Sequence, residues 1–304
     1  MPTAVIFPGQ GTQRPGMGRA WIDHSAWSIV PRVDDALGEN VGRLITDADE
    51  AELARTREAQ LAILLTSLVA WEALRPTLDA GDPPIAFGGH SLGQVTALIA
   101  SGALPLEDGV RFAARRAELT QRAADDHPGR MAALLGATVE QAEASCDGID
   151  GCWIANDNAP GQVVIAGTPD GVDAGCAAAK ELGVKRATAL NVGGAFHTPL
   201  MDDAAKGLID VLADVTFADP VAPVVSNDDA QPYATAAGWT DRLAEHVCRP
   251  VRWRESQLTF TALGATRAFE VGSGSMLAAL AKRTVPDLHI VNIASPGDVE
   301  QEGN

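Results

Sequence analysis

One short stretch, Gly-His-Ser-Leu-Gly at positions 89–93, constrains this 304-residue chain more than any other feature. An apolar run at 84–88 precedes it, and a run typical of a helix follows at 94–100. Between a strand and a helix, a Gly-x-Ser-x-Gly turn is too tight for flanking side chains and lifts the serine hydroxyl out of the sheet. The helix directs free N–H groups and its positive dipole end at the serine, where an oxyanion would need them. The pattern therefore predicts Ser91 as a nucleophile.

The rest of the chain alternates short apolar strands with helix patterns that carry charges on one face. Such alternation is typical of an α/β fold, in which a parallel sheet has helices on both faces. Pro76 is expected to stop the longest helix, because an interior proline removes a helix hydrogen bond, and the polar segment 297–304 is expected to fray. Strands are predicted at 4–7, 85–87, 222–226 and 268–271, and helices at 57–74, 108–124, 199–212, 240–247 and 253–263.

The middle of the chain, residues 128–195, has a different order of elements. A strong turn signal at 157–162, rich in Asp, Asn, Pro and Gly, separates two of its strands. The order βαββαβ is ferredoxin-like, so we expect a small inserted subdomain within a large hydrolase-like parallel-sheet subdomain made of residues 1–127 and 196–304. The strands of the insertion are predicted at 131–136, 153–156, 163–167 and 186–192, and its helices at 139–146 and 171–182.

Composition excludes several classes of function. The chain has 23 basic and 40 acidic residues and a formal charge of −17, which disfavours binding to nucleic acid or to an anionic membrane. Its four cysteines form no Cys-x-x-Cys pair and have no histidine at zinc-ligand spacing, so we expect packing residues in a reducing compartment and no metal site. There is no basic leader and no apolar run of membrane length, and we therefore expect a soluble cytoplasmic protein.

A serine nucleophile needs a general base, and six histidines are available. His90 neighbours Ser91 but is expected to point from the other side of the turn. His197 follows Gly-Gly-Ala-Phe at 193–196 and precedes Thr-Pro, so it lies at a loop end, where catalytic groups tend to lie. The alternative is a helix-start histidine without a catalytic role. Core elements follow His197 and no third carboxylate is evident, so a dyad oriented by a backbone carbonyl fits better than a triad.

Several motifs extend the pattern beyond the serine turn. In chain order they are Phe-Pro-Gly-Gln-Gly-Thr-Gln at 7–13, Gly-His-Ser-Leu-Gly at 89–93, Arg116, Asn-x-Asn-x-Pro-Gly-Gln at 156–162, Gly-Ala-Phe-His at 194–197, Pro-Val-Arg-Trp at 250–253 and Glu-Val-Gly-x-Gly at 270–274. From residue 4 to about residue 284, the chain resembles the malonyl-CoA:acyl-carrier-protein transacylase family. That family is related to the acyltransferase domains of polyketide and fatty-acid synthases. Six independent motifs make this resemblance highly specific.

The resemblance implies a role for each matching position. Ser91 would carry the acyl group as an ester, and His197 would be its base and later the acid that releases the CoA thiol. The backbone N–H groups of Gln10 and Leu92 would form the oxyanion hole. Arg116 would hold the free carboxylate of a malonyl group, a task that suits a guanidinium fork in a partly buried site.

Further positions are assigned by the same resemblance. Asn158 and Phe196 would contact the substrate, and a phenylalanine at this place goes with malonyl rather than methylmalonyl in the resembling family. The backbone carbonyl of His246 would orient the catalytic histidine. The chain departs from the family pattern, which usually has Glu, Gly and Gln, at three positions: Gln94, Ala117 and His246. These departures remove no catalytic group, and they leave the pH behaviour and the substrate shape open.

The implied reaction uses malonyl-CoA as substrate and an acyl carrier protein as partner, needs no bound cofactor, and is expected of a monomer. Because carrier proteins are acidic, an enzyme with a charge of −17 needs a local basic patch near its active-site mouth. The candidates are Lys180, Lys185 and Arg186 in the insertion and Arg249 after it.

Two alternatives stay open from the sequence. One is an editing hydrolase of the same fold that frees acyl groups from carrier proteins, which would need no carboxylate clamp such as Arg116. The other is a non-catalytic module that docks carrier proteins, and the complete set of Ser91, His197 and Gln10 argues against it. The sequence does not distinguish fatty-acid from polyketide synthesis.

Overall fold

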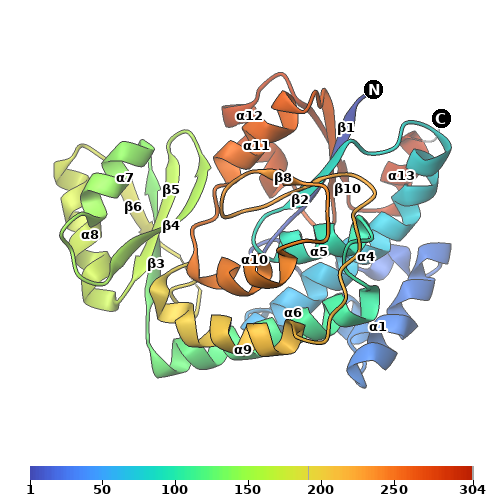
Figure 1. Cartoon of the computed structure of the whole chain (residues 1–304), viewed down its shortest axis with the longest axis horizontal. Coiled ribbons are helices and arrows are strands. Elements are labelled where there is room, and N and C mark those ends of the chain that lie inside the picture. Colours follow the sequence, from blue (N-terminus) through green and yellow to red (C-terminus); the bar gives the residue numbers. More distant parts are fainter. Residues whose placement is uncertain (191, 303–304) are drawn as a thin grey trace.

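A computed structural model describes residues 1–190 and 192–302 and shows two sheets in one chain (Figure 1). The larger sheet has the strand order β10-β9-β1-β2-β7-β8, and its neighbours are parallel except for the antiparallel edge pair β7–β8. This confirms the predicted α/β class. The strands are β1 (Thr3–Phe7), β2 (Ala86–Gly89), β7 (Val224–Val225), β8 (Pro232–Tyr233), β9 (Arg267–Val271) and β10 (His289–Ile293).

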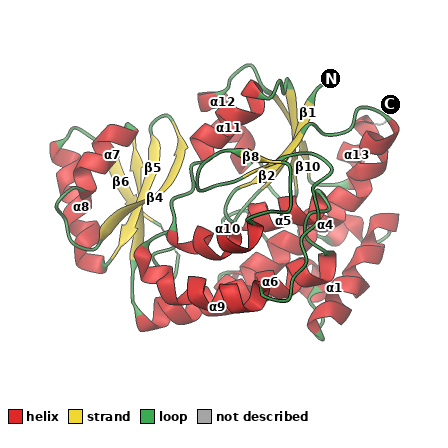
Figure 2. Cartoon of the chain, in the orientation of Figure 1, coloured by secondary structure: helices red, strands yellow, loops and turns green. Residues whose placement is uncertain are grey.

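Helices cover both faces of this sheet, because successive side chains of a strand point to opposite sides (Figure 2). Val5 and Phe7 pack into the core formed with α4 and α5, whereas Ala4 and Ile6 pack into the core formed with α11 and α12. The helices of this subdomain are α1 (Ile29–Leu37), α2 (Gly42–Thr46), α3 (Glu50–Leu53), α4 (Thr56–Ala80), α5 (Leu92–Ala100), α6 (Leu106–Asp126), α9 (Asp202–Leu212), α10 (Trp239–Glu245), α11 (Trp253–Ala262), α12 (Met276–Thr284) and α13 (Pro296–Glu302). Four short 3₁₀ turns complete it: η1 (Arg19–Trp21), η2 (Ser25–Ser28), η3 (Pro199–Met201) and η4 (His246–Cys248).

The predicted stop of the longest helix is wrong, because α4 continues through Pro76 to Ala80. Pro76 lies on the exposed side, where water can satisfy the carbonyl that the proline leaves without a donor, and Leu78 beyond it is buried. Among the described residues, α4 is the one helix long and apolar enough to cross a membrane, and 78% of its most apolar window is buried inside the fold. The apolar side chains of α4 therefore pack in the core of the large subdomain.

The predicted fraying of 297–304 is also wrong where the structure describes this segment. Helix α13 covers Pro296–Glu302 and contacts α4. Asp298 accepts backbone N–H bonds from Ala294 and Ser295, and Glu302 pairs with Arg267 at 2.8 Å. Polar side chains thus hold the end of the chain although the helix buries no residue. Residues 303–304 lie outside the described part.

The second sheet is antiparallel, with the strand order β4-β5-β3-β6, and has a core of its own. This order with two crossover helices is ferredoxin-like, as predicted. We call residues 130–189 the inserted subdomain, while the limits 128 and 195 stay a prediction. Its elements are β3 (Arg130–Leu135), α7 (Val139–Cys146), β4 (Cys152–Ala159), β5 (Gln162–Gly167), α8 (Pro169–Glu181) and β6 (Arg186–Ala189); the strand predicted to reach residue 192 includes Asn191, which lies outside the described residues.

The turn predicted at 157–162 is too long, since β4 extends to Ala159 with two register shifts and β5 begins at Gln162, which leaves a turn at 160–161. Tertiary contacts explain the difference. Asp157 pairs with Arg254 at 2.8 Å, and its backbone N–H donates to the Val251 carbonyl at 2.9 Å. These partners belong to the large subdomain. The edge strand β4 of the small sheet therefore also connects the two subdomains beside the site.

Candidate active site

Ser91 lies in a strained turn between β2 and α5, with φ 52° and ψ −106°. A Cβ on Gly89 would come within 2.1 Å of the Gly93 backbone, and one on Gly93 within 2.1 Å of the Phe7 carbonyl. Only glycine fits both positions, which is why the motif needs them. A backbone of this kind costs roughly 1–3 kcal/mol and persists only where neighbouring groups hold it.

The side chain of Asn227 holds the strained turn at Ser91 in place. Its Oδ1 accepts the Ser91 N–H at 2.8 Å, and its Nδ2 donates to the Gly89 carbonyl at 2.8 Å. Gln94 accepts the Asn227 backbone N–H at 2.6 Å, and both side chains are fully buried. The sequence analysis missed Asn227. The available signal was a polar run, Ser-Asn-Asp-Asp at 226–229, directly after a predicted strand.

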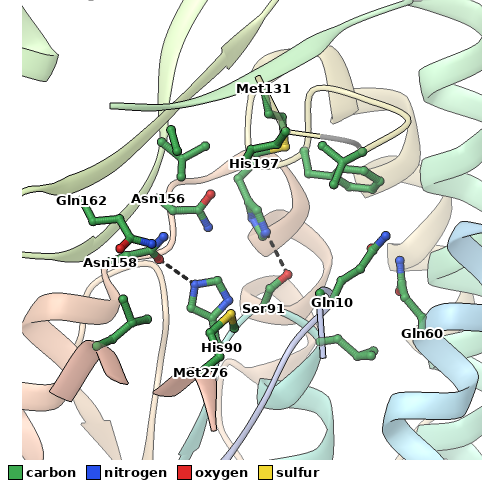
Figure 3. A pocket seen from close by; sticks show the side chains of 18 of the residues that line it. Gln10, Gln60, His90, Ser91, Met131, Asn156, Asn158, Gln162, His197 and Met276 are labelled. Carbon is green, nitrogen blue, oxygen red and sulfur yellow. Dashed lines mark hydrogen bonds between the residues drawn. The ribbon is translucent and has the colours of Figure 1, made fainter. Parts of the chain in front are cut away.

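Two backbone carbonyls hold the His197 ring beside Ser91. Its Nδ1 donates to the carbonyls of His246 at 2.9 Å and Arg249 at 3.1 Å, which leaves Nε2 as an acceptor. Nε2 lies 2.8 Å from Ser91 Oγ (Figure 3). Nucleophile, base and orienting group thus form a continuous chain without a carboxylate.

Burial keeps His197 neutral. Removal from water, followed by the positive charge of Arg116, lowers the pKa of His197 to about 3. The ring of His246 packs against it with centroids 5.0 Å apart, and burial also lowers the pKa of His246 well below its ordinary value. A neutral imidazole at pH 7 can take the serine proton.

Arg116 reaches the same hydroxyl from α6. Its side chain is 3% exposed, with one guanidinium nitrogen 3.0 Å from Ser91 Oγ and another 2.7 Å from Gln60 Oε1. No carboxylate in the described part of the chain pairs with it, whereas the neighbouring Arg115 is exposed and pairs with Glu118. Burial lowers the pKa of Arg116 to about 10, so it stays cationic at pH 7. A buried cation without an anion is costly, and an anionic ligand would relieve that cost.

Gln60 was also missed by the sequence analysis. It is 1% exposed on α4 and holds the guanidinium of Arg116. The signal was one amide within the apolar run at 59–65, a place where a polar side chain needs a buried partner.

A cavity of about 360 Å³ opens over Ser91 between the two subdomains. Gln10, Leu92 and Phe196 line it from the large subdomain, and Asn158 lines it from β4. His90 lines it as well, with Nε2 2.8 Å from Asn158 Oδ1 (Figure 3). The contact with Asn158 turns the His90 ring toward the inserted subdomain rather than toward Ser91.

The four basic candidates for partner docking do not lie on one element. Lys180, Lys185 and Arg186 are exposed at the end of α8 and the start of β6, and none of them forms an ion pair with the described residues. Arg249 is exposed in the large subdomain and pairs with Glu245. Of the four candidates, the three in the inserted subdomain are therefore the ones without an ion pair to a described residue.

A strained serine, a neutral histidine held by carbonyls and a buried guanidinium define a site for covalent acyl transfer with an anionic acyl group. A family model described as the acyl transferase domain matches residues 4–301. The malonyl CoA-acyl carrier protein transacylase of Bacillus subtilis is 36% identical over 303 residues, which cover 98% of this chain and 95% of that protein. The enzyme of the same name from Escherichia coli K12 is 34% identical, with 94% and 93% covered.

Solved structures agree with these relatives. An acyl carrier protein S-malonyltransferase from Vibrio cholerae aligns with a TM-score of 0.94 and 31% identity over 99% of both chains. The malonyl-transacylase in a complex with a type II polyketide synthase acyl-carrier protein aligns equally well, with 0.94, 31% and 99% of both chains. The chain belongs to the acyl transferase family, in the branch formed by the malonyl CoA-acyl carrier protein transacylases.

Proposed function

We propose that this protein transfers a malonyl group from malonyl-CoA to the phosphopantetheine thiol of an acyl carrier protein, through an ester on Ser91. The observation that carries the proposal is the buried guanidinium of Arg116, unpaired with any described carboxylate and 3.0 Å from Ser91 Oγ. An acyl group bound to Ser91 with a free carboxylate at its other end would supply the missing anion. A guanidinium fork binds such a carboxylate at two points.

In the first half-reaction, Ser91 Oγ attacks the thioester carbonyl of malonyl-CoA while His197 Nε2 takes its proton. The backbone N–H groups of Gln10 and Leu92 stabilise the oxyanion that forms. The C–S bond then breaks, and His197 gives its proton to the departing CoA sulfur. Arg116 holds the malonyl carboxylate throughout, so that the ester stays in place.

The second half-reaction reverses the first with another thiol. The carrier thiol loses its proton to His197 and attacks the Ser91 ester, and the proton returns to Ser91 as the C–O bond breaks. His246 acts through its backbone carbonyl, which holds the tautomer of His197. Asn158 positions the substrate from the wall of the inserted subdomain, and Phe196 excludes a branch at the malonyl α-carbon. Each step uses only groups of the chain, of the thioester malonyl-CoA and of the carrier thiol.

The editing hydrolase is the less favoured reading. It would gain nothing from a cation buried beside the nucleophile, because it need not hold an acyl group by a free carboxylate. The relatives and the solved neighbours named above are all transferases by name. Lys180, Lys185, Arg186 and Arg249 are proposed as the basic groups that meet the acidic carrier protein.

One incubation distinguishes the candidate functions. The protein is mixed with malonyl-CoA labelled in the malonyl group, with and without a phosphopantetheinylated carrier protein, and Ser91→Ala is the matched control. We expect stable label on the protein alone and rapid transfer of that label to the carrier. Rapid release of free malonate without carrier would indicate the hydrolase, and an unlabelled protein would indicate a docking module.

A further inference from the structure

Two of the four cysteines meet in the inserted subdomain, away from the cavity over Ser91. Cys146 is the last residue of α7 and Cys152 is the first residue of β4. Their sulfur atoms are 3.2 Å apart, and both are free thiols. The spacing of the two residues carries no recognised motif, and the expectation that all four cysteines only fill space does not explain this contact.

The chain between the two thiols can adjust to a covalent bond. It is the five-residue turn 147–151, which contains Gly148 with φ 69° and Gly151 with φ 76°. No atom lies near the position of a Cβ on Gly148, so this part of the turn is open to solvent. A disulfide requires the sulfurs to approach to about 2.05 Å, and the exposed part of the turn around Gly148 can absorb that shift.

The two thiols differ in access. Cys146 is half-buried and, like Cys152, borders a surface hollow that is also lined by Asp147 and Trp153. Cys152 is only 4% exposed and is held in the β4–β5 ladder opposite Gly167. A small oxidant in the hollow therefore reaches Cys146 more easily than it reaches Cys152.

We propose that Cys146 and Cys152 form a reversible disulfide when the protein meets a peroxide. The thiolate of Cys146 attacks a peroxide oxygen, the O–O bond breaks, and a sulfenic acid and one water form from hydrogen peroxide. The sulfur of Cys152 then attacks the Cys146 sulfur, the S–O bond of the sulfenic acid breaks, and its hydroxyl leaves as a second water with the Cys152 proton. Two thiols and hydrogen peroxide thus become one disulfide and two waters.

The order of these steps follows from the environment of each thiol. The hydrogen bond between the two sulfurs lowers the pKa of Cys146, and the same bond together with burial raises the pKa of Cys152. Cys146 is therefore the thiol that reacts with the peroxide, and Cys152 is the one that resolves the sulfenic acid.

The chain contains its own control. Cys248 is half-buried in the large subdomain, where burial and a hydrogen bond to Asp202 raise its pKa to about 12. Such a thiol reacts slowly with a peroxide.

Cys176 could compete with Cys146 for a disulfide to Cys152. It lies on α8 next to Gly175, where an added Cβ would come within 2.6 Å of the Cys152 sulfur.

The test uses the reduced full chain and hydrogen peroxide as the probe, followed by alkylation of the remaining thiols. Cleavage before Asp147 and Asp150 separates the two cysteines, so that only a disulfide keeps their peptides together in a mass spectrum. We expect this linked pair, alkylated Cys176 and Cys248, and recovery of both thiols after dithiothreitol. Linkage of Cys152 to Cys176, or oxidation of Cys146 to a sulfinic acid with Cys152 still free, would overturn the proposal.

Two variants and one control variant sharpen the test without depending on activity. Cys152→Ser should lose the disulfide and accumulate a sulfenic acid on Cys146 that a dimedone probe traps. Cys146→Ser should slow the oxidation of Cys152 by about tenfold or more. Cys248→Ser should behave like the parent chain. Circular dichroism of each reduced variant confirms that it is folded, and equal oxidation of Cys152 with and without Cys146 would contradict the proposed order.

Discussion

The two subdomains contribute different kinds of groups to the same cavity. Among the described residues that line it, every ionisable side chain comes from the large subdomain: His90, Arg116 and His197. The inserted subdomain contributes amides and apolar side chains, of which Asn158 and Met131 are examples. The large subdomain thus holds the groups able to move protons and bind charge, and the inserted subdomain supplies a wall without ionisable side chains among the described residues that line the cavity.

Backbone strain follows the same division. The non-glycine residues of the described chain with positive φ are Ser91, His197 and Ala230, and all three belong to the large subdomain. The inserted subdomain has its own core and a regular ladder except for two register shifts along β4, between Ile154 and Ala159. The strained backbone lies at the proposed nucleophile and base, whereas the inserted subdomain is regular. The backbone geometry is therefore more tightly constrained at the groups where bonds would form and break.

The largest effect should come from removing the two reacting groups of the large subdomain, Ser91 and His197. Ser91→Ala should abolish acylation and His197→Ala should reduce it by roughly 10³–10⁶, because nucleophile and base act as a unit. Intact-protein mass spectrometry after treatment with malonyl-CoA measures the adduct. A malonyl adduct that persists in Ser91→Ala would show that the reacting group lies elsewhere.

Next in size is the loss of the buried cation. Arg116→Ala should weaken malonyl transfer by roughly 2–4 kcal/mol and raise acetyl transfer relative to it, since a carboxylate without a partner is costly in a closed cavity. The ratio of kcat/KM for malonyl-CoA and acetyl-CoA measures this. Arg115→Ala, on the same helix but exposed, is the control. An unchanged ratio in Arg116→Ala would remove the proposed role.

A smaller effect concerns pH and stability. His197 has a folded-state pKa of about 3, below the value near 6.5 of an unfolded chain, so the unfolded state binds more protons between these values. The free energy of unfolding should therefore fall as the pH is lowered from 6.5 toward 3. His197→Gln should reduce that slope by up to about 1.4 kcal/mol per pH unit. Urea unfolding at several pH values checks this, and a slope equal to that of the parent would contradict a buried neutral His197.

The smallest effect should come from the inserted subdomain. The double change Lys185→Glu and Arg186→Glu should raise KM for carrier protein about three- to tenfold at low ionic strength and leave self-acylation unchanged. Steady-state kinetics at two salt concentrations measure it. The double change Arg32→Glu and Arg75→Glu, at exposed positions of α1 and α4, is the matched charge reversal. Equal effects of the two variants would mean that net charge rather than a docking patch is responsible.

Much of the large subdomain could be predicted because its signals are local. The strand, the turn with glycines at 89 and 93 and the helix follow one another in the chain, so the sequence indicates the turn although Asn227 holds it in the fold, and the alternation of β1 indicates both faces of the sheet. Predictions failed where a distant group overrode a local preference. Pro76 lies inside α4 because a buried residue beyond it anchors the helix, and residues 157–159 of the expected turn became strand through contacts with the large subdomain, while 160–161 remain a turn.

The sequence by itself determined the fold class, the inserted ferredoxin-like unit and the identity of Ser91, His197 and Arg116 as the candidate reacting groups. The tertiary structure decided what holds them. Asn227 bonds to Ser91 across 136 positions of the chain, and Gln60 to Arg116 across 56. Such pairs leave no spacing pattern, because a side chain's partner in a folded protein is set by how elements pack and not by their separation along the chain.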